Sequence, residues 1–317
     1  MQNTLTVFGG TGFVGLSIYD CFNQGLLKPF SITRLNLVSR ATVNKSLRFN
    51  KMTRHFKFDF FRGKGDLPEI SNFIIVAFDS TNYNYYDDKF NNKIIFKNFK
   101  KIIVNKYPQA KILYLSSGAI YGKQHIAGKK FSENYKNFNY KDLDYYKLNY
   151  SLNKKFFEEN LEILSKKKIS ISIARCFTFV GPRLPLQQNF AIGNFFLNLI
   201  RKEPIKILSK RQVIRSYMCS KDLVFWLLSI LNVTDNKFKI FNVGSEISIS
   251  LIDLAKRFKK IFKCEIQYPK ILLDKNKSAD IYVPNCKKII TTLNLNYEKN
   301  IDKLIINTYE IIKRNEY

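Results

Sequence analysis

The first half of the chain alternates short apolar runs with segments of helical periodicity. Five apolar runs predict strands, at residues 4–10, 34–40, 55–60, 72–78 and 111–117. A sixth run, at 170–175, follows a stretch from about 144 to 167 whose apolar positions recur at helical spacing. Strands that alternate with helices in this way predict an α/β fold with a parallel, doubly wound Rossmann sheet.

Beyond Gly181 and Pro182 the alternation becomes less regular. Helical patterns appear near residues 189–202, 221–232, 250–262 and 301–313. We therefore expect a Rossmann domain over residues 1–180 and a smaller α/β lobe over 181–317 that binds substrate. The boundary is expected to be interleaved, because part of the later chain can return to the sheet.

A glycine-rich segment lies directly after the first predicted strand and opens an amphipathic helix. Its G-x-x-G-x-x-G spacing begins at the first of two adjacent glycines, and the glycines let the backbone turn tightly and approach a pyrophosphate. Amide groups at the positive end of the helix would hold the phosphate charge. The segment predicts a dinucleotide site made by Gly9, Gly10, Thr11, Gly12, Phe13, Val14 and Gly15.

The end of the second predicted strand bears on which dinucleotide is preferred. NAD users place a carboxylate there to bond the ribose 2′-hydroxyl, whereas this strand ends in Val38, Ser39 and Arg40. A hydroxyl followed by a guanidinium suits a 2′-phosphate, so we expect NADP(H) to be favoured over NAD(H). Asp59, at the end of the third strand, is a candidate contact for the adenine.

Three residues form a candidate proton-transfer group. Tyr150 and Lys154 are four residues apart in a predicted helix, which places them on one face, and Ser117 ends the fifth strand. A phenol has a reference pKa of about 10, and a nearby ammonium stabilises its ionised form. Tyr150 is the candidate general acid or base, and Ser117 can hydrogen-bond the reacting oxygen.

Further candidate segments follow Ser117, Tyr150 and Lys154 along the chain. They are Arg175 to Arg183, then Arg215, Ser216 and Tyr217, and then Asp222. With them the chain resembles, over nearly its full length, the extended short-chain dehydrogenases of the NAD-dependent epimerase/dehydratase family. The resemblance implies catalytic roles for Ser117, Tyr150 and Lys154 and a nucleotide-diphosphate sugar as substrate. It implicates Arg215 in pairing with the diphosphate, and Arg183 and Asn194 as weaker candidates for that task.

The resemblance also narrows the reaction. Sugar 4,6-dehydratases of this kind carry an Asp-Glu pair after the strand-five hydroxyl, and Gly118 and Ala119 stand there instead. We expect an NADPH-dependent reductase of a nucleotide-linked 4-keto-6-deoxysugar. One alternative is a nucleotide-sugar 4-epimerase with bound NAD. An alternative from another class is a non-catalytic dinucleotide sensor or RNA-binding relative.

Composition sets limits on these readings. The net charge is +28, but the lysines are spread along the chain, which favours a solvated surface over a nucleic-acid groove. No apolar run is long enough to span a membrane, and the first apolar stretch lacks a signal peptide's basic leader. The five widely spaced cysteines suggest reduced thiols and no metal site, so we expect a cytoplasmic protein. The resemblance adds an expected homodimer and a role in polysaccharide biosynthesis.

Two segments depart from the family pattern. Phe78, Asp79, Ser80 and Thr81 replace the small apolar residues that usually follow the fourth strand, so Asp79 could oppose a cofactor phosphate. Residues 209–212 replace a turn that often contains glycine. The substrate side is therefore expected to be remodelled.

Overall fold

The computed structural model describes residues 3–42, 49–78, 88–124, 129–135, 138, 140–141, 143–186, 190–269 and 279–314. Asp79, Ser80 and Thr81 lie outside the described residues. Backbone contacts divide the chain into two compact units, and each is assembled from three segments. Unit 1 comprises Met1–Ile120, Asp142–Arg175 and Val224–Phe241, and unit 2 comprises Tyr121–Lys141, Cys176–Leu223 and Asn242–Tyr317.

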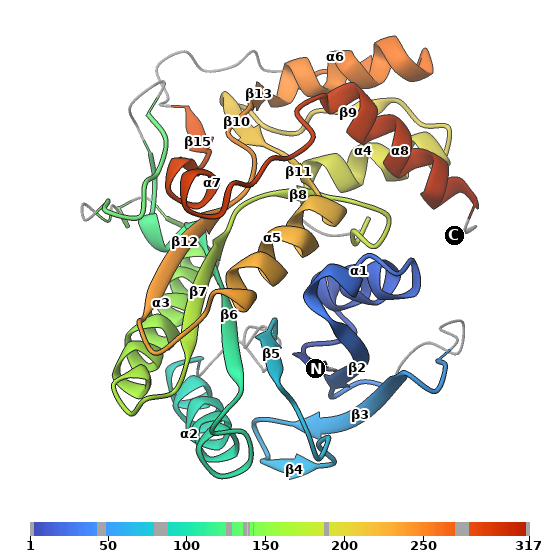
Figure 1. Ribbon diagram of the computed structural model, residues 1–317. Coiled ribbons are helices and arrows are strands. Elements are labelled where there is room, and N and C mark those ends of the chain that lie inside the picture. The colour runs from blue at the N-terminus through green and yellow to red at the C-terminus, as the bar shows by residue number, and fades with distance from the viewer. Residues whose placement is uncertain are drawn as a thin grey trace. The chain divides into compact units, whose positions relative to one another are not determined.

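An eight-stranded sheet forms the centre of unit 1, in the order β12-β7-β6-β5-β1-β2-β3-β4 (Figure 1). All six predicted strands are present, and the predicted α/β fold is confirmed. The strands are β1 (Asn3–Phe8), β2 (Ile32–Ser39), β3 (Thr53–Asp59), β4 (Lys64–Gly65), β5 (Phe73–Val76), β6 (Lys111–Ser117), β7 (Ile171–Cys176) and β12 (Lys239–Val243).

The strand order reverses at β1. It pairs in parallel with β2 on one side and with β5 on the other, so the chain winds outward in both directions from this strand. The pairs β2–β3 and β5–β6 are also parallel, whereas the short β4 returns antiparallel to β3. In open sheets of this type, ligands bind beyond the carboxyl ends of the strands at such a reversal.

Helices α2 (Asp88–Lys106) and α3 (Tyr145–Ser165) pack on one face of this sheet. Phe99 and Ile103 of α2 and Phe157 and Leu161 of α3 are buried against apolar residues of β1, β5, β6 and β7. Figure 1 shows α1 (Phe13–Asn23) on the other side of the strands, and the part of α5 (Ser220–Asn232) that belongs to unit 1 joins it, with Phe225 in contact with Phe30. Helices therefore cover both faces of the sheet.

The Asp144 side chain determines where α3 begins. Its carboxylate accepts the backbone N–H of Lys147 at 2.9 Å, which satisfies one of the amide groups left over at a helix start. Tyr150 and Lys154 therefore come one and two turns into α3. The predicted helix at 144–167 agrees with this element.

Unit 2 contains short sheets and three of the four helices predicted for the second half, because most of α5, the helix predicted at 221–232, belongs to unit 1. Its strands are β8 (Phe179–Val180), β9 (Ile205–Lys206), β10 (Val213–Ser216), β11 (Met218–Cys219), β13 (Ser248–Ser250), β14 (Ile266–Gln267) and β15 (Asp280–Tyr282). Its helices are α4 (Ala191–Ile200), α6 (Leu251–Phe262), α7 (Lys287–Leu293) and α8 (Ile301–Arg314). In the three-stranded sheet, β10 lies between β13 and β15.

Within the described ranges, no helix has the length and apolarity needed to cross a membrane. The five cysteines are free thiols.

Candidate functional site

Three glycines of the segment after β1 are required by packing. Gly9 has φ +92°, and a Cβ placed on it would lie 2.6 Å from the carbonyl carbon of Ala77. A Cβ on Gly10 would lie 2.6 Å from that of Leu37, and one on Gly15 would overlap the carbonyl of Gly10. Larger side chains at these positions would push the loop away from β2, from Ala77 after β5 and from α1, so the loop holds its shape because of these glycines.

Gly12 differs from the other three. A Cβ placed on it would meet only the carbonyl oxygen of Gly9, at 3.4 Å, which is an ordinary contact. It is the N-cap residue of α1, and no side chain caps this helix start. Folding does not explain the missing side chain, whereas a ligand that approaches the backbone does. An open helix start of this kind can hold an anion such as a pyrophosphate, and the dinucleotide site at the start of α1 stays a prediction.

The other predicted cofactor residues stand at the ends of β2 and β3. The Ser39 hydroxyl lies within hydrogen-bond distance of the Ala41 carbonyl and of His55, and Arg40 is exposed. Oδ1 of Asp59 accepts the backbone N–H groups of Phe61 at 2.8 Å and Arg62 at 3.2 Å. The Asp59 carboxylate therefore has a fixed orientation after β3, and its contact with an adenine stays a prediction.

Lys154 is anchored between α3 and β6. Its side chain is buried, and Nζ donates to the backbone carbonyl of Leu115 at 3.1 Å. The same Nζ lies 5.6 Å from the ring centroid of Tyr150 and 5.2 Å from that of Tyr114. The ammonium thus lies beside the phenol ring of Tyr150.

Ser117 ends β6 two residues after Leu115. Its hydroxyl accepts the backbone N–H of Ala119 at 3.1 Å, and the residue is buried. From α3, the hydroxyl of Ser151 lies 2.9 Å from the carbonyl oxygen of Ala119. Two contacts, Lys154 to Leu115 and Ser151 to Ala119, therefore tie α3 to the end of β6. Unit 1 contains the whole predicted group of Ser117, Tyr150 and Lys154.

A buried ion pair lies one helical turn beyond Lys154. Arg175 on β7 donates Nη2–H to Oε2 of Glu158 at 2.7 Å, and its Nε–H lies 3.1 Å from Oε1. Both side chains are less than a tenth exposed. Sequence reasoning missed the pair, although Tyr150, Lys154 and Glu158 follow one another at intervals of four residues. That spacing was the available signal.

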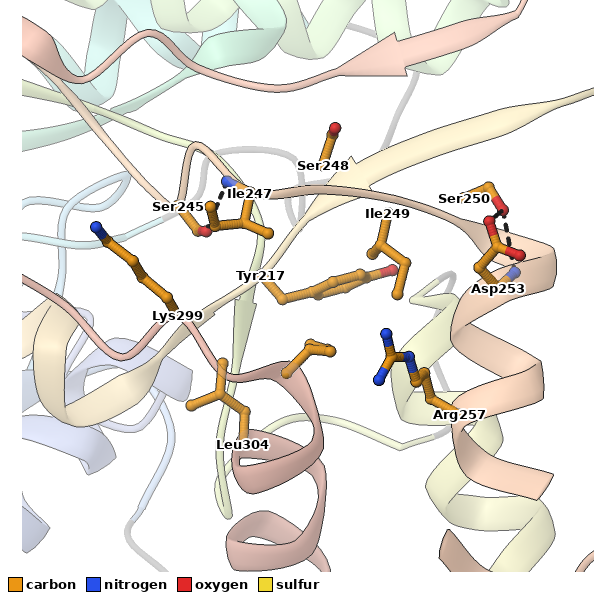
Figure 2. Close-up of a pocket in the computed structure, with 11 residues that line it drawn as sticks. Tyr217, Ser245, Ile247, Ser248, Ile249, Ser250, Asp253, Arg257, Lys299 and Leu304 are labelled. Carbon is orange, nitrogen blue, oxygen red and sulfur yellow. Dashed lines mark hydrogen bonds between the residues drawn. The ribbon is translucent and has the colours of Figure 1, made fainter. Parts of the chain in front are cut away.

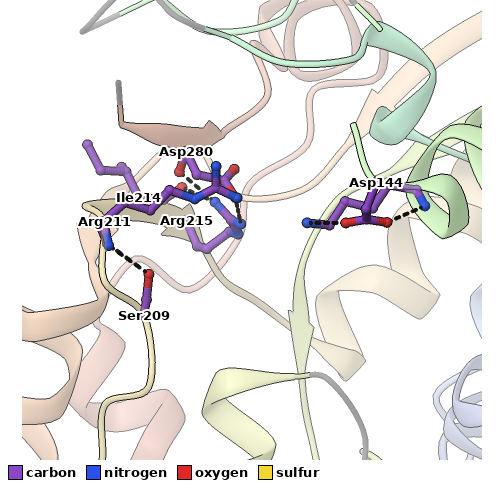
Figure 3. A network of polar contacts seen from close by, with 7 residues as sticks. Asp144, Ser209, Arg211, Ile214, Arg215 and Asp280 are labelled. Atoms are coloured by element: carbon purple, nitrogen blue, oxygen red, sulfur yellow. Dashed lines mark hydrogen bonds and ion pairs between the residues drawn. The ribbon is translucent and has the colours of Figure 1, made fainter. Parts of the chain in front are cut away.

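In unit 2, Arg215 on β10 makes contacts with Asp280 on β15 (Figure 3). Nη1 donates to the backbone carbonyl of Asp280 at 2.7 Å, and Nη2 lies 3.1 Å from its Oδ2. The same carboxylate oxygen lies 3.5 Å from Nη2 of Arg211. Two guanidinium groups share one carboxylate, so the cluster of three keeps a net positive charge that can pair with a diphosphate.

Arg183 and Asn194 also belong to unit 2. Arg183 follows β8, and Asn194 lies in the first turn of α4. Their action together with Arg215 on one diphosphate stays a prediction. Sequence reasoning missed Asp280 as the partner of Arg215, because β15 is far from β10 in the sequence.

Tyr217, the last residue of the Arg-Ser-Tyr segment, lines a cavity of about 310 Å³ in unit 2 (Figure 2). Ile249 and Leu304 contribute apolar walls, and Arg257, which pairs with Asp302 at 2.9 Å, lines another side. Burial raises the pKa of Tyr217 to about 12, although Arg215 opposes the rise. The phenol is therefore protonated near neutral pH and is a hydrogen-bond donor inside this cavity.

Comparisons with known proteins agree with the fold described above. The family model described as "NAD dependent epimerase/dehydratase family" matches residues 5–244. UDP-glucuronic acid decarboxylase 1 of Arabidopsis thaliana is 28% identical over 93 residues, which is 29% of this chain and 21% of that protein. The matched segment thus spans about a fifth of this curated relative.

Two solved structures share the fold over nearly their whole length. An NAD complex of dTDP-glucose 4,6-dehydratase from Bacillus anthracis has a TM-score of 0.77 at 15% identity, covering 99% of this chain and 97% of that chain. UDP-glucose 4-epimerase with UDP-glucose from Thermotoga maritima has a TM-score of 0.75 at 17% identity, covering 98% and 99%. Because the family match covers most of the sequence and the fold agrees with it, this chain belongs to the NAD-dependent epimerase/dehydratase family.

Proposed function

We propose that this chain binds a nicotinamide dinucleotide and acts by hydride transfer at a sugar carbon of a nucleotide-diphosphate sugar. The observation that carries the proposal is the anchoring of Lys154 on the Leu115 carbonyl, which sets its ammonium beside Tyr150. Ser117 lies on the same strand as Leu115, and the open helix start at Gly12 provides the phosphate site.

The residues have distinct tasks in this reaction. When bound, the dinucleotide supplies or accepts the hydride. Tyr150 gives a proton to the sugar oxygen or removes one, Ser117 hydrogen-bonds that oxygen, and Lys154 stabilises the phenolate. Amide groups at the start of α1 bind the pyrophosphate, while Arg215 contributes positive charge for the diphosphate of the sugar.

Two versions of the reaction have separate support. Gly118 and Ala119 offer no acid or base for water elimination, and Arg40 suits a 2′-phosphate, which supports reduction of a 4-keto-6-deoxysugar with NADPH. The fold shared with a UDP-glucose 4-epimerase supports epimerisation with bound NAD. In that version Tyr150 removes a proton and later returns it to the same oxygen.

One experiment separates the two versions. The purified protein is incubated with UDP-glucose, UDP-glucuronic acid and a dTDP-4-keto-6-deoxysugar, and the sugars are followed by NMR while the absorbance of reduced nicotinamide is recorded. Reductase activity consumes NADPH in proportion to the keto-sugar. Epimerase activity converts a UDP-sugar with no net change in absorbance. Conversion of none of these sugars in the presence of either cofactor contradicts the proposal.

We also propose a homodimer formed through α2 and α3. These helices pack on each other, and apolar side chains remain exposed on both, with Val104 40% and Ile163 60% exposed. Exposed apolar surface of this kind favours contact with a second copy. Sedimentation of the wild type and of Ile163→Glu tests this: we expect a dimer and a monomer, and a monomeric wild type contradicts it.

A further inference from the structure

The cavity that Tyr217 lines is built from unit 2 alone. Its walls come from the residue after β10, the segment around β13, the first turns of α6 and the start of α8 (Figure 2). Among the described residues, none of those expected to bind the dinucleotide or the sugar lines it. Arg215, two residues before Tyr217, is held by Asp280 on β15. The proposed reaction therefore leaves this cavity without a task.

The Tyr217 hydroxyl faces this cavity without a protein partner. The residue is only 5% exposed, and among the residues that the structure describes its hydroxyl has no hydrogen-bond partner. Two other buried tyrosines differ: Tyr107 donates to the Pro68 carbonyl, and Tyr121 donates to Oδ1 of Asn242 at 2.8 Å. Buried hydroxyls are usually paired, because an unpaired one costs free energy. The protonated Tyr217 phenol therefore offers its hydrogen to a group that enters the cavity.

The charges around the cavity favour an anion. Figure 2 shows the hydroxyl end of Tyr217 directed towards the side where Arg257 lies. Nη1 of Arg257 donates to Asp302 at 2.9 Å, and the guanidinium has further N–H groups on Nε and Nη2. Lys299 is a second cation in the lining, and Asp253 is its carboxylate. Two cations against one carboxylate favour a ligand with a single negative charge.

The remaining walls are apolar. They are formed by four aliphatic side chains, those of Ile247, Ile249, Ile301 and Leu304. The cavity measures about 310 Å³, and liquid water takes about 30 Å³ per molecule, so the space suits about ten non-hydrogen atoms. Sites for small molecules combine apolar walls with a few placed polar groups in this way. A bare inorganic ion would leave these walls uncovered, so the ligand that fits has an apolar body.

We propose that this cavity is an additional ligand site, which binds a small monocarboxylate with an apolar body. The carboxylate accepts hydrogen bonds from the Tyr217 hydroxyl and from Arg257, and the body packs between Ile249 and Leu304. A carboxylate suits two donors because it presents two acceptor oxygens. A phosphate monoester carries about 1.5 to 2 negative charges at neutral pH, which exceeds the single positive charge of the lining.

The test is isothermal titration of the full chain with benzoate, hexanoate and 3-phenylpropionate, and with the neutral primary amide of each. We expect saturable binding of at least one carboxylate at one site, and binding of its amide that is about tenfold weaker. Tyr217→Phe keeps the ring and should weaken the carboxylate about tenfold, with a thermal midpoint close to that of wild type. Tyr268→Phe, at a 52% exposed tyrosine of unit 2, is the matched control and should bind like wild type. Arg257→Gln should also weaken binding.

Several results would overturn the proposal. Saturable binding of none of the three carboxylates overturns it, and so does equal binding of the amides or of inorganic phosphate. Unchanged affinity in folded Tyr217→Phe and Arg257→Gln would show that the carboxylate binds elsewhere. Saturating NAD or UDP-glucose should leave the dissociation constant of the carboxylate unchanged, because the site lies outside the proposed reaction. Displacement by either would place the carboxylate in the site of that ligand and contradict the proposal.

Discussion

Glu158 on α3 and Arg175 on β7 form a buried ion pair at 2.7 Å, on the helix face that also carries Tyr150 and Lys154. The pair joins the helix to a strand of the sheet at a point where water has little access. The pair lies one turn beyond Lys154. Ser151, Lys154 and Glu158 of α3 therefore contact, in that order, Ala119, Leu115 and Arg175. The proton-transfer group is therefore supported along two turns of helix.

Removal of one partner of the Glu158–Arg175 ion pair should lower the free energy of unfolding much more than removal of both partners. Glu158→Ala leaves Arg175 as a buried, uncompensated charge and should lower the free energy of unfolding by about 3 kcal/mol. The double variant Glu158→Met, Arg175→Met leaves no such charge and should recover much of that loss. Urea denaturation followed by circular dichroism measures both. A double variant less stable than the single one would contradict this account of the pair.

Substitutions of Gly9 and Gly12 should have different effects: the first should lower stability, and the second should lower the affinity for the cofactor. Gly9→Ala places a Cβ at φ +92° against the Ala77 backbone and should destabilise the protein by about 1–3 kcal/mol. Gly12→Asp meets no such obstacle and supplies an N-cap residue that helices favour, so its thermal midpoint should be close to that of wild type.

The Gly12→Asp carboxylate nevertheless repels a pyrophosphate at the start of α1. We expect its affinity for NAD to fall by about 100-fold or more, measured by isothermal titration. If Gly12→Asp binds NAD as well as wild type does, the phosphate site lies elsewhere.

The Tyr150 hydroxyl should be essential for turnover but not for folding. Tyr150→Phe removes the proton carrier and should lower kcat by about 10²- to 10⁴-fold with little change in the thermal midpoint. Tyr146→Phe, on the same helix but 63% exposed, is the matched control and should behave like wild type. Steady-state rates on the converted sugar measure both, and equal rates for Tyr150→Phe and Tyr146→Phe would remove Tyr150 from the mechanism.

Stability should depend on pH through His55. Its pKa in the folded protein lies below the reference value of 6.5, so between these two values the unfolded chain binds more protons than the folded one. Stability is then fully present above pH 6.5 and declines as the pH falls through that window. The chain has two histidines, so few other groups titrate there.

His55→Gln should flatten this part of the stability curve, because glutamine does not titrate. Urea midpoints of wild type and His55→Gln at a series of pH values from 5 to 8 test the point. A wild-type curve with the same slope as the variant would show that His55 contributes no linkage.

Much of unit 1 could be predicted from the sequence because its signals are local. Parallel strands buried on both faces leave continuous apolar runs, and the β1 run followed by glycines identifies both a strand and a helix start. The spacing of Tyr150 and Lys154 is likewise local, since four residues make about one helical turn. These features do not depend on distant parts of the chain.

Other features depend on partners far apart in sequence. Lys239–Val243 adds to the sheet beside β7 only after the chain has passed through unit 2 and returned as α5. Glu158 and Arg175 are unremarkable charges until α3 packs on β7, and His55 meets Ser39 only because β3 lies next to β2.

The most direct test of the account is isothermal titration of the purified wild-type protein with NAD, NADH, NADP and NADPH, with Gly12→Asp as the control. The account predicts saturable binding of a dinucleotide at one site per chain, and loss of that binding in a Gly12→Asp variant that remains folded. Absence of binding for all four dinucleotides, in protein first freed of any retained nucleotide, would contradict the central claim.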